Sequence, residues 1–221
     1  MRILITGSSS GIGLATSKYF LSKGFEVVGI DLLPSSINNP HYQHYIADIA
    51  EYDDLPELES FDYIFNNAGK QNSIDDIHNN LVGTINVTRK YGFEKTIKSI
   101  LFNASASAST GFEFDEYVAS KAGVIGYMKY VACKLAEQGS TANSISFGGV
   151  FTDSNEEVMN NDELWVKIME VTPLKKWVSL DEACDWVYFL LVTNKSMSGQ
   201  DVLIDNGEKD LNNTFVWPEY K

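Results

Sequence analysis

The stretch Thr6-Gly7-Ser8-Ser9-Ser10-Gly11-Ile12-Gly13 decides the fold of this chain. It follows an apolar, β-branched run, Arg2–Thr6, and opens an amphipathic segment, Gly11–Lys23, after which a second apolar run, Glu26–Ile30, begins. Strand, glycine turn, helix and strand in this order are typical of a βαβ unit. Glycines let the backbone approach a pyrophosphate closely, and the free N–H groups at a helix N-terminus favour an anion there. The alternative is a tight strand-to-helix turn that holds no ligand.

The same alternation of short apolar runs and amphipathic segments continues to the end of the chain. It predicts a three-layer, doubly wound α/β fold of the Rossmann type, with helices between the strands of a mostly parallel seven-stranded sheet. A length of 221 residues fits a single nucleotide-binding domain over residues 1–221. The strands are predicted at Arg2–Thr6, Glu26–Ile30, His44–Ile46, Tyr63–Asn66, Ser99–Asn103, Thr141–Ser146 and Asp201–Ile204.

Composition excludes several classes of partner. A formal net charge of −13 argues against a nucleic-acid-binding surface, which concentrates Lys and Arg. The chain has neither a signal-peptide pattern nor a long apolar run, so we expect a cytoplasmic protein without a membrane partner. Cys133 and Cys184 lie in apolar-periodic segments and are expected to be buried, and the three histidines form no ligand spacing. We therefore assign no metal.

Asp31 follows the second predicted strand and indicates which nucleotide the glycine turn holds. A carboxylate at this position can accept hydrogen bonds from both hydroxyls of an adenosine ribose, and it repels a 2′-phosphate. No Arg or Lys lies within Ser8–Ser10 or just after Asp31 to neutralise such a phosphate. The sequence thus predicts NAD(H) rather than NADP(H). The alternative is an Asp that caps a turn before Pro34.

Tyr117-Val118-Ala119-Ser120-Lys121 places a phenol and an ammonium group on one face of a helix, at i and i+4. An unperturbed tyrosine has a pKa of about 10, which is too high for a base at neutral pH. A lysine cation beside it favours the phenolate and lowers the pKa of the phenol. Tyr117 is therefore the candidate acid/base, and the alternative is an ordinary solvated Tyr/Lys pair.

The glycine turn, the run Asn66-Asn67-Ala68-Gly69 and the Tyr117–Lys121 pair together resemble the short-chain dehydrogenase/reductase family, whose fingerprints include TGxxxGIG, NNAG and YxxxK. The resemblance covers nearly the whole chain. It implies a cofactor site formed by Gly7, Ser9, Ser10, Gly11, Ile12, Gly13, Asp31, Asp48, Ile49, Asn67, Ala68, Gly69, Tyr117, Lys121, Val150 and Thr152.

The resemblance also implies a catalytic serine that orients the substrate oxygen near Tyr117. Alignment with the fifth strand of the family selects Ser105, twelve residues before Tyr117. An alignment that is fixed on Asn103 instead places Ala106 there and leaves Ser107 as the nearby hydroxyl. We prefer Ser105, and Ser107 stays open.

A further implied residue is Asn80, which matches the asparagine that in the family kinks a helix and holds a water in the proton relay; Asn79 is its rival. Asn143–Thr152 resembles the pattern NxxSPGxVxT, in which Val150 and Thr152 hold the nicotinamide carboxamide, but Phe147 replaces the proline. The connections from Asp48 to Asn66 and from Gly69 to Asn80 are shorter than usual. We therefore expect a substrate pocket that is more open, or completed by a partner subunit.

The leading hypothesis is an NAD-dependent oxidoreductase acting on the CH–OH group of donors, with Tyr117, Lys121, Ser105 and Asn80 as its catalytic residues. The alternative is an inactive, nucleotide-sensing protein with the same fold, and an epimerase or dehydratase ranks last because the chain lacks room for a larger substrate domain. The resemblance implies a homodimer or homotetramer, and the tail Leu211–Lys221 could dock on a neighbouring subunit or on its own domain. The small-molecule substrate is not identified by the sequence.

Overall fold

Seven strands form one sheet in the order β3-β2-β1-β4-β5-β6-β7, and each of the six pairings is parallel. The computed structural model describes residues 1–71, 73–112 and 114–211. The predicted α/β fold with a parallel seven-stranded sheet is confirmed, and no strand end is displaced by more than two residues. The strands are β1 Arg2–Thr6, β2 Glu26–Asp31, β3 Tyr42–Ile46, β4 Tyr63–Asn66, β5 Ser99–Asn103, β6 Thr141–Phe147 and β7 Asp201–Ile204.

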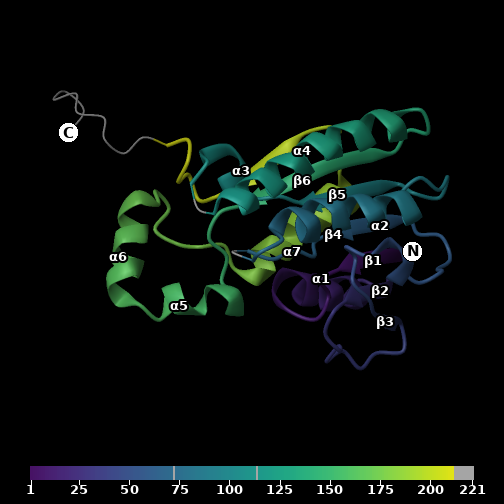
Figure 1. Ribbon diagram of the computed structural model, residues 1–221, viewed down its shortest axis with the longest axis horizontal. Helices are drawn as coiled ribbons and strands as arrows, with labels where there is room; N and C mark the ends of the chain where they lie inside the picture. The colour runs from purple at the N-terminus through teal and green to yellow at the C-terminus, as the bar shows by residue number, and fades with distance from the viewer. Residues whose placement is uncertain (72, 113, 212–221) are drawn as a thin grey trace.

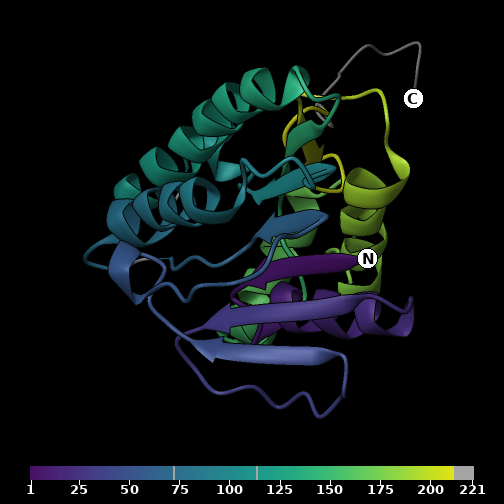
Figure 2. The same ribbon diagram turned by 90° about the vertical axis from the view of Figure 1, so that its right-hand side faces the viewer.

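Helices cover both faces of this sheet (Figure 2). α1 (Gly11–Ser22) and α7 (Leu180–Tyr188) pack side by side on one face, while α2 (Gly83–Tyr91) and α4 (Asp115–Ala136) cover the other. Alternate residues of β1 point to opposite faces, so Ile3 and Ile5 belong to one apolar cluster and Leu4 to the other. The two clusters are the core of a three-layer fold.

The remaining elements are short or lie outside the sheet. Residues 156–171 form α5 and α6, which stand apart from the sheet (Figure 1). A π-helical segment, η2, precedes α2 directly, and another, η4, follows α7. The bounds are η1 Tyr52–Asp54, η2 Ile77–Val82, α3 Ser107–Thr110, η3 Asp153–Asn155, α5 Glu156–Met159, α6 Asp162–Val171 and η4 Phe189–Thr193.

The predicted helices are missing from two connections. Residues 32–41, between β2 and β3, contain no helix, and residues 47–62, between β3 and β4, contain only the 3₁₀ turn η1. Proline lacks a backbone N–H donor and clashes with the preceding turn of a helix. Pro34 and Pro40 bracket most of the first connection, and Pro56 interrupts the second, so neither offers a long uninterrupted stretch for a helix. Leu55 and Phe61 fill the space on the sheet instead, with 3% and 1% of their surface exposed.

The structure corrects the expected burial of Cys133 and shows where the apolar residues of α4 lie. Cys133 is exposed on α4, because it lies off the buried face of that helix, whereas Cys184 is buried as expected. Val124, Met128 and Val131, which could have served an interface, belong to the core. Among the described residues, no helix is long and apolar enough to cross a membrane. The predicted docking of the tail lies outside the described residues from position 212 onward.

The packing of residues 47–62 can be tested by shortening one side chain. Leu55→Ala should lower the free energy of unfolding by roughly 2–5 kcal/mol, because it leaves a cavity where the sheet has no covering helix. Leu58→Ala, in the same segment, removes a side chain that is only partly buried and should cost clearly less. Urea unfolding of both variants measures the difference, and equal losses would contradict this account of the crossover.

Candidate active site

The turn after β1 lies in direct backbone contact with the turn after β4. A Cβ atom on Gly13 would lie 2.0 Å from the carbonyl oxygen of Gly7, and one on Gly7 would lie 2.8 Å from the Cα of Ala68. Gly7 also has a φ of 68°, which side-chain-bearing residues rarely adopt. Ser10, the N-cap of α1, makes no side-chain cap hydrogen bond. The first N–H groups of α1 are therefore not capped by that side chain, and they suit an anion such as a pyrophosphate.

A chain of hydrogen bonds joins this turn to α4. The hydroxyl of Thr6 accepts from the backbone N–H groups of Asn67 and Ala68, both at 3.0 Å. The amide of Asn67 donates to the carbonyl of Thr6 at 3.1 Å, and its oxygen accepts from the amide of Asn103 at 3.0 Å. The carbonyl oxygen of Asn103 in turn accepts from Lys121 Nζ at 2.9 Å. The ends of β1, β4 and β5 and the helix α4 are thus held in one arrangement.

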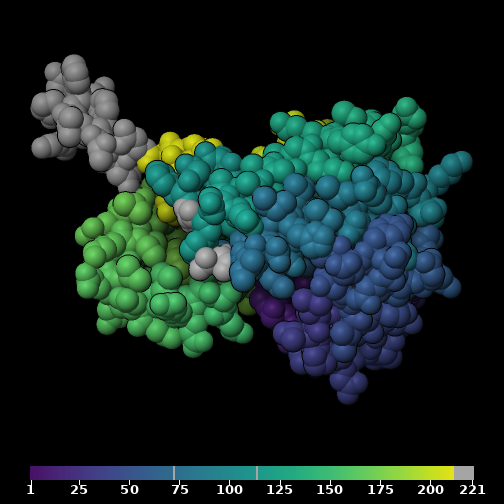
Figure 3. Space-filling model, in the orientation of Figure 1, coloured from purple at the N-terminus to yellow at the C-terminus, as the bar shows by residue number. Residues whose placement is uncertain are grey.

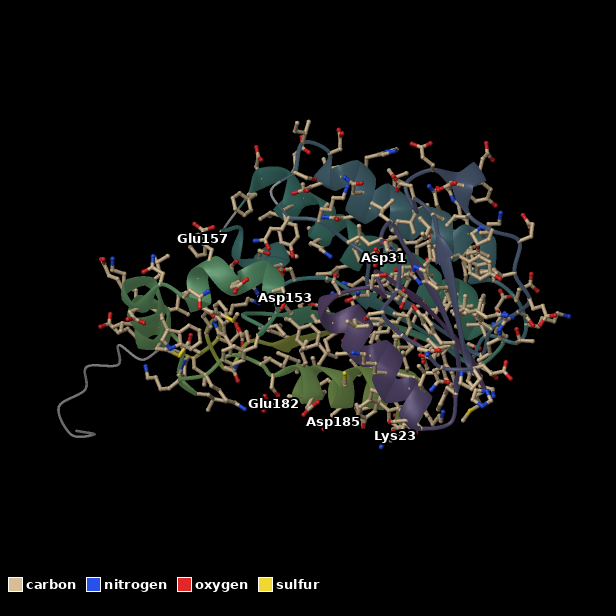
Figure 4. All side chains as sticks on the ribbon, turned by 90° about the horizontal axis from the view of Figure 1, so that it is seen from below. Lys23, Asp31, Asp153, Glu157, Glu182 and Asp185 are labelled. Atoms are coloured by element: carbon tan, nitrogen blue, oxygen red, sulfur yellow. The ribbon has the colours of Figure 1, made fainter. Side chains whose placement is uncertain are left out.

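The carboxylate of Asp31 ends β2 and is fixed by two backbone donors. Oδ2 accepts from the N–H of Ser9 and Oδ1 from the N–H of Leu33, each at 2.9 Å. The bond from Leu33 caps the turn before Pro34, the role that the sequence offered as the alternative for Asp31. The bond from Ser9 ties the carboxylate to the glycine turn. In Figure 4, Asp31 and Asp153 lie by the amino-terminal end of α1, and Lys23 lies at the other end. The acidic group therefore lies beside the start of α1.

Asp48 and Ile49 are anchored by contacts that the sequence did not reveal. Asp48 Oδ1 accepts from the N–H of Ala50 at 2.9 Å, and Ile49 is buried against Gly83. The side-chain amide of Asn86, on α2, donates to the carbonyl oxygens of Ile49 and Ala50 at 3.1 and 2.9 Å. A single asparagine in a helical pattern gave no signal of this role, which holds one wall of the predicted adenine site.

Tyr117 and Lys121 lie in the first two turns of α4. Lys121 Nζ lies 5.7 Å from the centre of the Tyr117 ring. Lys121 is 4% exposed, and burial lowers the pKa of its ammonium group from 10.5 to about 8, while the negative charge of Asp76 opposes that shift. A Cβ atom on Gly69 would lie 3.2 Å from Nζ, so this glycine leaves room for the cation. The ammonium group of Lys121 therefore loses its proton more easily than that of an exposed lysine.

The structure places Asn80, and not Asn79, against α4. Asn80 is 1% exposed in the π-helical segment η2, and its amide donates to Ser120 Oγ at 3.0 Å. The same side chain bonds both backbone groups of Lys70, through Oδ1 at 2.7 Å and Nδ2 at 2.8 Å. The amide of Asn79 donates instead to the backbone of Asp75. The irregular helix lets Asn80 join the turn after β4 to the helix of Tyr117.

Ser105 and Ser107, the two candidates for the catalytic serine, lie side by side. Their hydroxyl oxygens are 2.5 Å apart, and both residues are buried. The backbone N–H of Ser107 also donates to Ser105 Oγ at 3.3 Å. Either hydroxyl can therefore be polarised by the other, and the preference for Ser105 stays a prediction.

The loop after β6 is closely packed although Phe147 replaces the proline of the family pattern. Phe147 ends β6 in a buried position, and its carbonyl oxygen accepts from the N–H of Ala106 at 3.0 Å. Val150 forms an isolated parallel bridge with Val178. A Cβ on Gly149 would lie 2.0 Å from the indole nitrogen of Trp177, so the loop packs tightly on that ring.

The segment with α5 and α6 forms one side of a notch in the surface of the protein. Figure 3 shows a notch between this green segment and the blue-violet amino-terminal half, with the dark violet start of the chain at its floor. Thr152 reaches the turn after β1, because its Cγ2 would lie 3.6 Å from a Cβ on Gly11. Phe151, Trp165 and Trp177 form an aromatic cluster with ring centres 5.0–5.9 Å apart. The sequence analysis did not predict this cluster, since the three rings come from separate parts of the segment.

Comparison with known proteins agrees with this arrangement. The family model described as enoyl-(acyl carrier protein) reductase matches residues 7–209. The short chain dehydrogenase ausX of Penicillium brasilianum is 27% identical over 245 residues, which cover 92% of this chain and 94% of that protein. The 3-oxoacyl-(acyl-carrier-protein) reductase FabG of Buchnera aphidicola is 26% identical over 233 residues, with 92% and 95% covered.

Among solved structures, a 4-hydroxyisoleucine dehydrogenase mutant complexed with NADH and succinate is similar to this chain, with a TM-score of 0.88 and 27% identity. The match covers 96% of this chain and 100% of that chain. Relatives of full length therefore share the fold and the order of the elements that carry the site.

Two glycine-to-alanine variants in helices should change stability in opposite directions. Gly13→Ala forces the turn after β1 away from its contact with Gly7 and should be destabilising, whereas Gly126→Ala on α4 meets no atom within 4 Å. An exposed helical glycine replaced by alanine typically gains about 0.5–1 kcal/mol. Urea unfolding compares the two, and a Gly13→Ala protein as stable as Gly126→Ala would contradict the close contact.

Proposed function

The chain belongs to the short-chain dehydrogenase/reductase family, and we propose that it catalyses NAD(H)-dependent interconversion of an alcohol and a carbonyl. The observation that carries the proposal is the buried ammonium group of Lys121, 5.7 Å from the centre of the Tyr117 ring and bonded to the end of β5. Burial of a cation costs stability. Ionisable groups with strongly shifted pKa values cluster at functional sites, which supports a chemical role for Lys121.

The residues around the turn after β1 fit a dinucleotide. Gly7 and Gly13 leave no room for side chains where the backbone must approach a pyrophosphate, and α1 begins without a side-chain cap. Asp31, held by Ser9 and Leu33, would accept the ribose hydroxyls and repel a 2′-phosphate. Val150 and Thr152 would hold the carboxamide. The nicotinamide ring, when bound, supplies the hydride acceptor or donor.

The selection of NAD(H) over NADP(H) is part of the proposal and rests on Asp31. The similar 4-hydroxyisoleucine dehydrogenase was solved with NADH, which supports the same choice here. The ribose hydroxyls are better partners for a carboxylate than a phosphate dianion, because two like charges at hydrogen-bond distance repel strongly. A charge-neutral residue at position 31 should weaken the preference.

Proton transfer falls to this chain's own side chains. The hydroxyl of Tyr117 would donate a proton to the carbonyl oxygen in reduction and accept one from the alcohol in oxidation. The charge of Lys121 would favour the phenolate, and Asn103 fixes the lysine by the hydrogen bond at 2.9 Å. Ser105, polarised by Ser107, would orient the substrate oxygen. Asn80, bonded to both backbone groups of Lys70, would extend the proton path away from Lys121.

The role of Tyr117 is tested by removing one oxygen atom. Tyr117→Phe should lower kcat by about 10²–10⁴-fold, the usual contribution of a general acid/base. Binding of NADH, followed by fluorescence, should persist. Tyr130→Phe on the same helix changes an exposed ring and should keep its activity. The proposed chemistry would be wrong if Tyr117→Phe turned over as fast as the wild type. It would also be wrong if the wild type reduced no compound of a broad carbonyl panel.

The nucleotide preference is tested with Asp31→Asn, which removes the charge and keeps an oxygen acceptor for the backbone N–H groups. The wild type should bind NADH at least about tenfold more tightly than NADPH, a difference of roughly 1.4 kcal/mol. The variant should narrow that ratio, mainly by tighter binding of NADPH. Asp48→Asn serves as the matched control, since it changes a carboxylate on the adenine side. A wild type without preference would overturn the role of Asp31.

A further inference from the structure

Asp76 is a fully buried carboxyl group to which the proposed chemistry assigns no role. Its exposed fraction is 0%. Oδ1 accepts from the backbone N–H of Ser73 at 3.0 Å and from the Ser73 hydroxyl, while Oδ2 has no hydrogen-bond partner. Burial of a carboxylate with one unpartnered oxygen is costly, so a nearby positive charge is the natural compensation.

The position of Asp76 brings it to the catalytic helix. It is the residue before the π-helical segment η2 and lies four positions before Asn80, so that the two side chains share one face. Asn80 meets that helix through its hydrogen bond to Ser120 Oγ at 3.0 Å. Ser120 directly precedes Lys121 in α4. Asp76 therefore directly precedes the segment that packs on the part of α4 that carries the buried ammonium group.

The charges around Lys121 come from few residues. Tyr117 faces it from its own helix, and Asp76 acts on it from the segment before η2. Lys70, Asp75 and His78 belong to the same connection but are exposed. Asn103, the lysine's partner on β5, is uncharged. Among the described residues, Asp76 is the buried acidic group of this connection.

We propose that Asp76 is a positioning residue: its carboxylate is the buried counter-charge that keeps the Lys121 ammonium protonated beside Tyr117. The pairing rests on the burial of both charged groups and on the contact between Asn80 and Ser120 that joins their two elements. Its consequence for turnover rests on the proposed function. Asp76 does not touch the reacting atoms. It acts through Lys121, and it thereby sets the alkaline limit of the pH range in which the lysine can assist the phenol.

The sign of the effect follows from the two opposing influences on the lysine. Burial lowers the pKa of Lys121, and the charge of Asp76 raises it. In Asp76→Asn only the lowering influence is left, so the lysine should lose its proton at a lower pH than in the wild type. We expect the pKa of Lys121 to fall by about one pH unit in Asp76→Asn, the lower end of the effect that a neighbouring opposite charge produces.

The first experiment measures the proton on Lys121 without turnover. In protein with ¹³C,¹⁵N-labelled lysine, an NMR pH titration follows the side-chain signal that disappears in Lys121→Met. Asp76→Asn should move that titration down by about one unit. Asp75→Asn removes an exposed carboxylate from the neighbouring position and should leave it in place, while Asp76→Glu should restore most of the wild-type value. A titration of Lys121 that is the same in Asp76→Asn and Asp75→Asn overturns the proposal.

A measurement on the wild type guards against a variant that does not fold. The ¹³C shift of the Asp76 carboxyl carbon, in protein labelled at aspartate, should show an ionised group at pH 7. A neutral Asp76 at that pH overturns the proposal without any substitution.

The second experiment connects the pair to the reaction. In alcohol oxidation, the alkaline limb of the pH profile of kcat/KM should move to lower pH in Asp76→Asn by the amount seen in the titration, and Asp75→Asn should follow the wild type. A lysine titration that shifts while the rate profile does not would show that the pairing exists but does not govern turnover. If Tyr117→Phe is inactive and the lysine does not shift, the proposed function stands and the role of Asp76 falls.

Discussion

The close backbone contact between the turn after β1 and the turn after β4 is the constraint on which the rest of the structure depends. Between Gly7, Gly13 and Ala68 there is no space for an additional methyl group. This contact lies where the strand order reverses, between β1 and β4, the position at which open α/β sheets form their crevice. The hydrogen bonds that pass from Thr6 through Asn67 and Asn103 to Lys121 carry the same constraint across to α4. A displacement of the glycine turn would therefore reach Lys121.

Much of the fold and part of the site could be predicted because they depend on local pattern. The strands β1, β4, β5 and β7 have the predicted bounds, since their apolar runs end at sharp polar or glycine boundaries. The helix-free connections escaped prediction, because sheet packing by Leu55 and Phe61 replaces a helix without any periodic signal. Asn86 and Asp76 escaped for the same reason: their partners lie far away along the chain or in an adjoining element.

Three of the six buried polar atoms that lack a hydrogen-bond partner in the described part of the chain lie near the candidate site. Asn66 Oδ1, Asp76 Oδ2 and Asn103 Oδ1 are buried without a hydrogen-bond partner, and each lies at or beside the carboxyl edge of the sheet. Elsewhere the buried serines of β6 are satisfied, for example by the carboxylate of Asp201. Unsatisfied groups are rare in natural cores and tend to mark functional regions. Their position here agrees with a site that orders itself around a ligand.

The short connection between Gly69 and Asn80 explains why the charge of Lys121 needs a buried partner such as Asp76. A longer segment could bring water or further polar side chains to the lysine, but here the backbone of Lys70 is bonded directly to Asn80, and the glycine before it leaves room only for the ammonium group. Two buried ions of opposite sign then stabilise each other where solvent cannot, although each alone would be driven to its neutral form. The shortened loop and the buried carboxylate are, in this view, one structural solution: the first removes solvent from Lys121, and the second keeps the lysine charged.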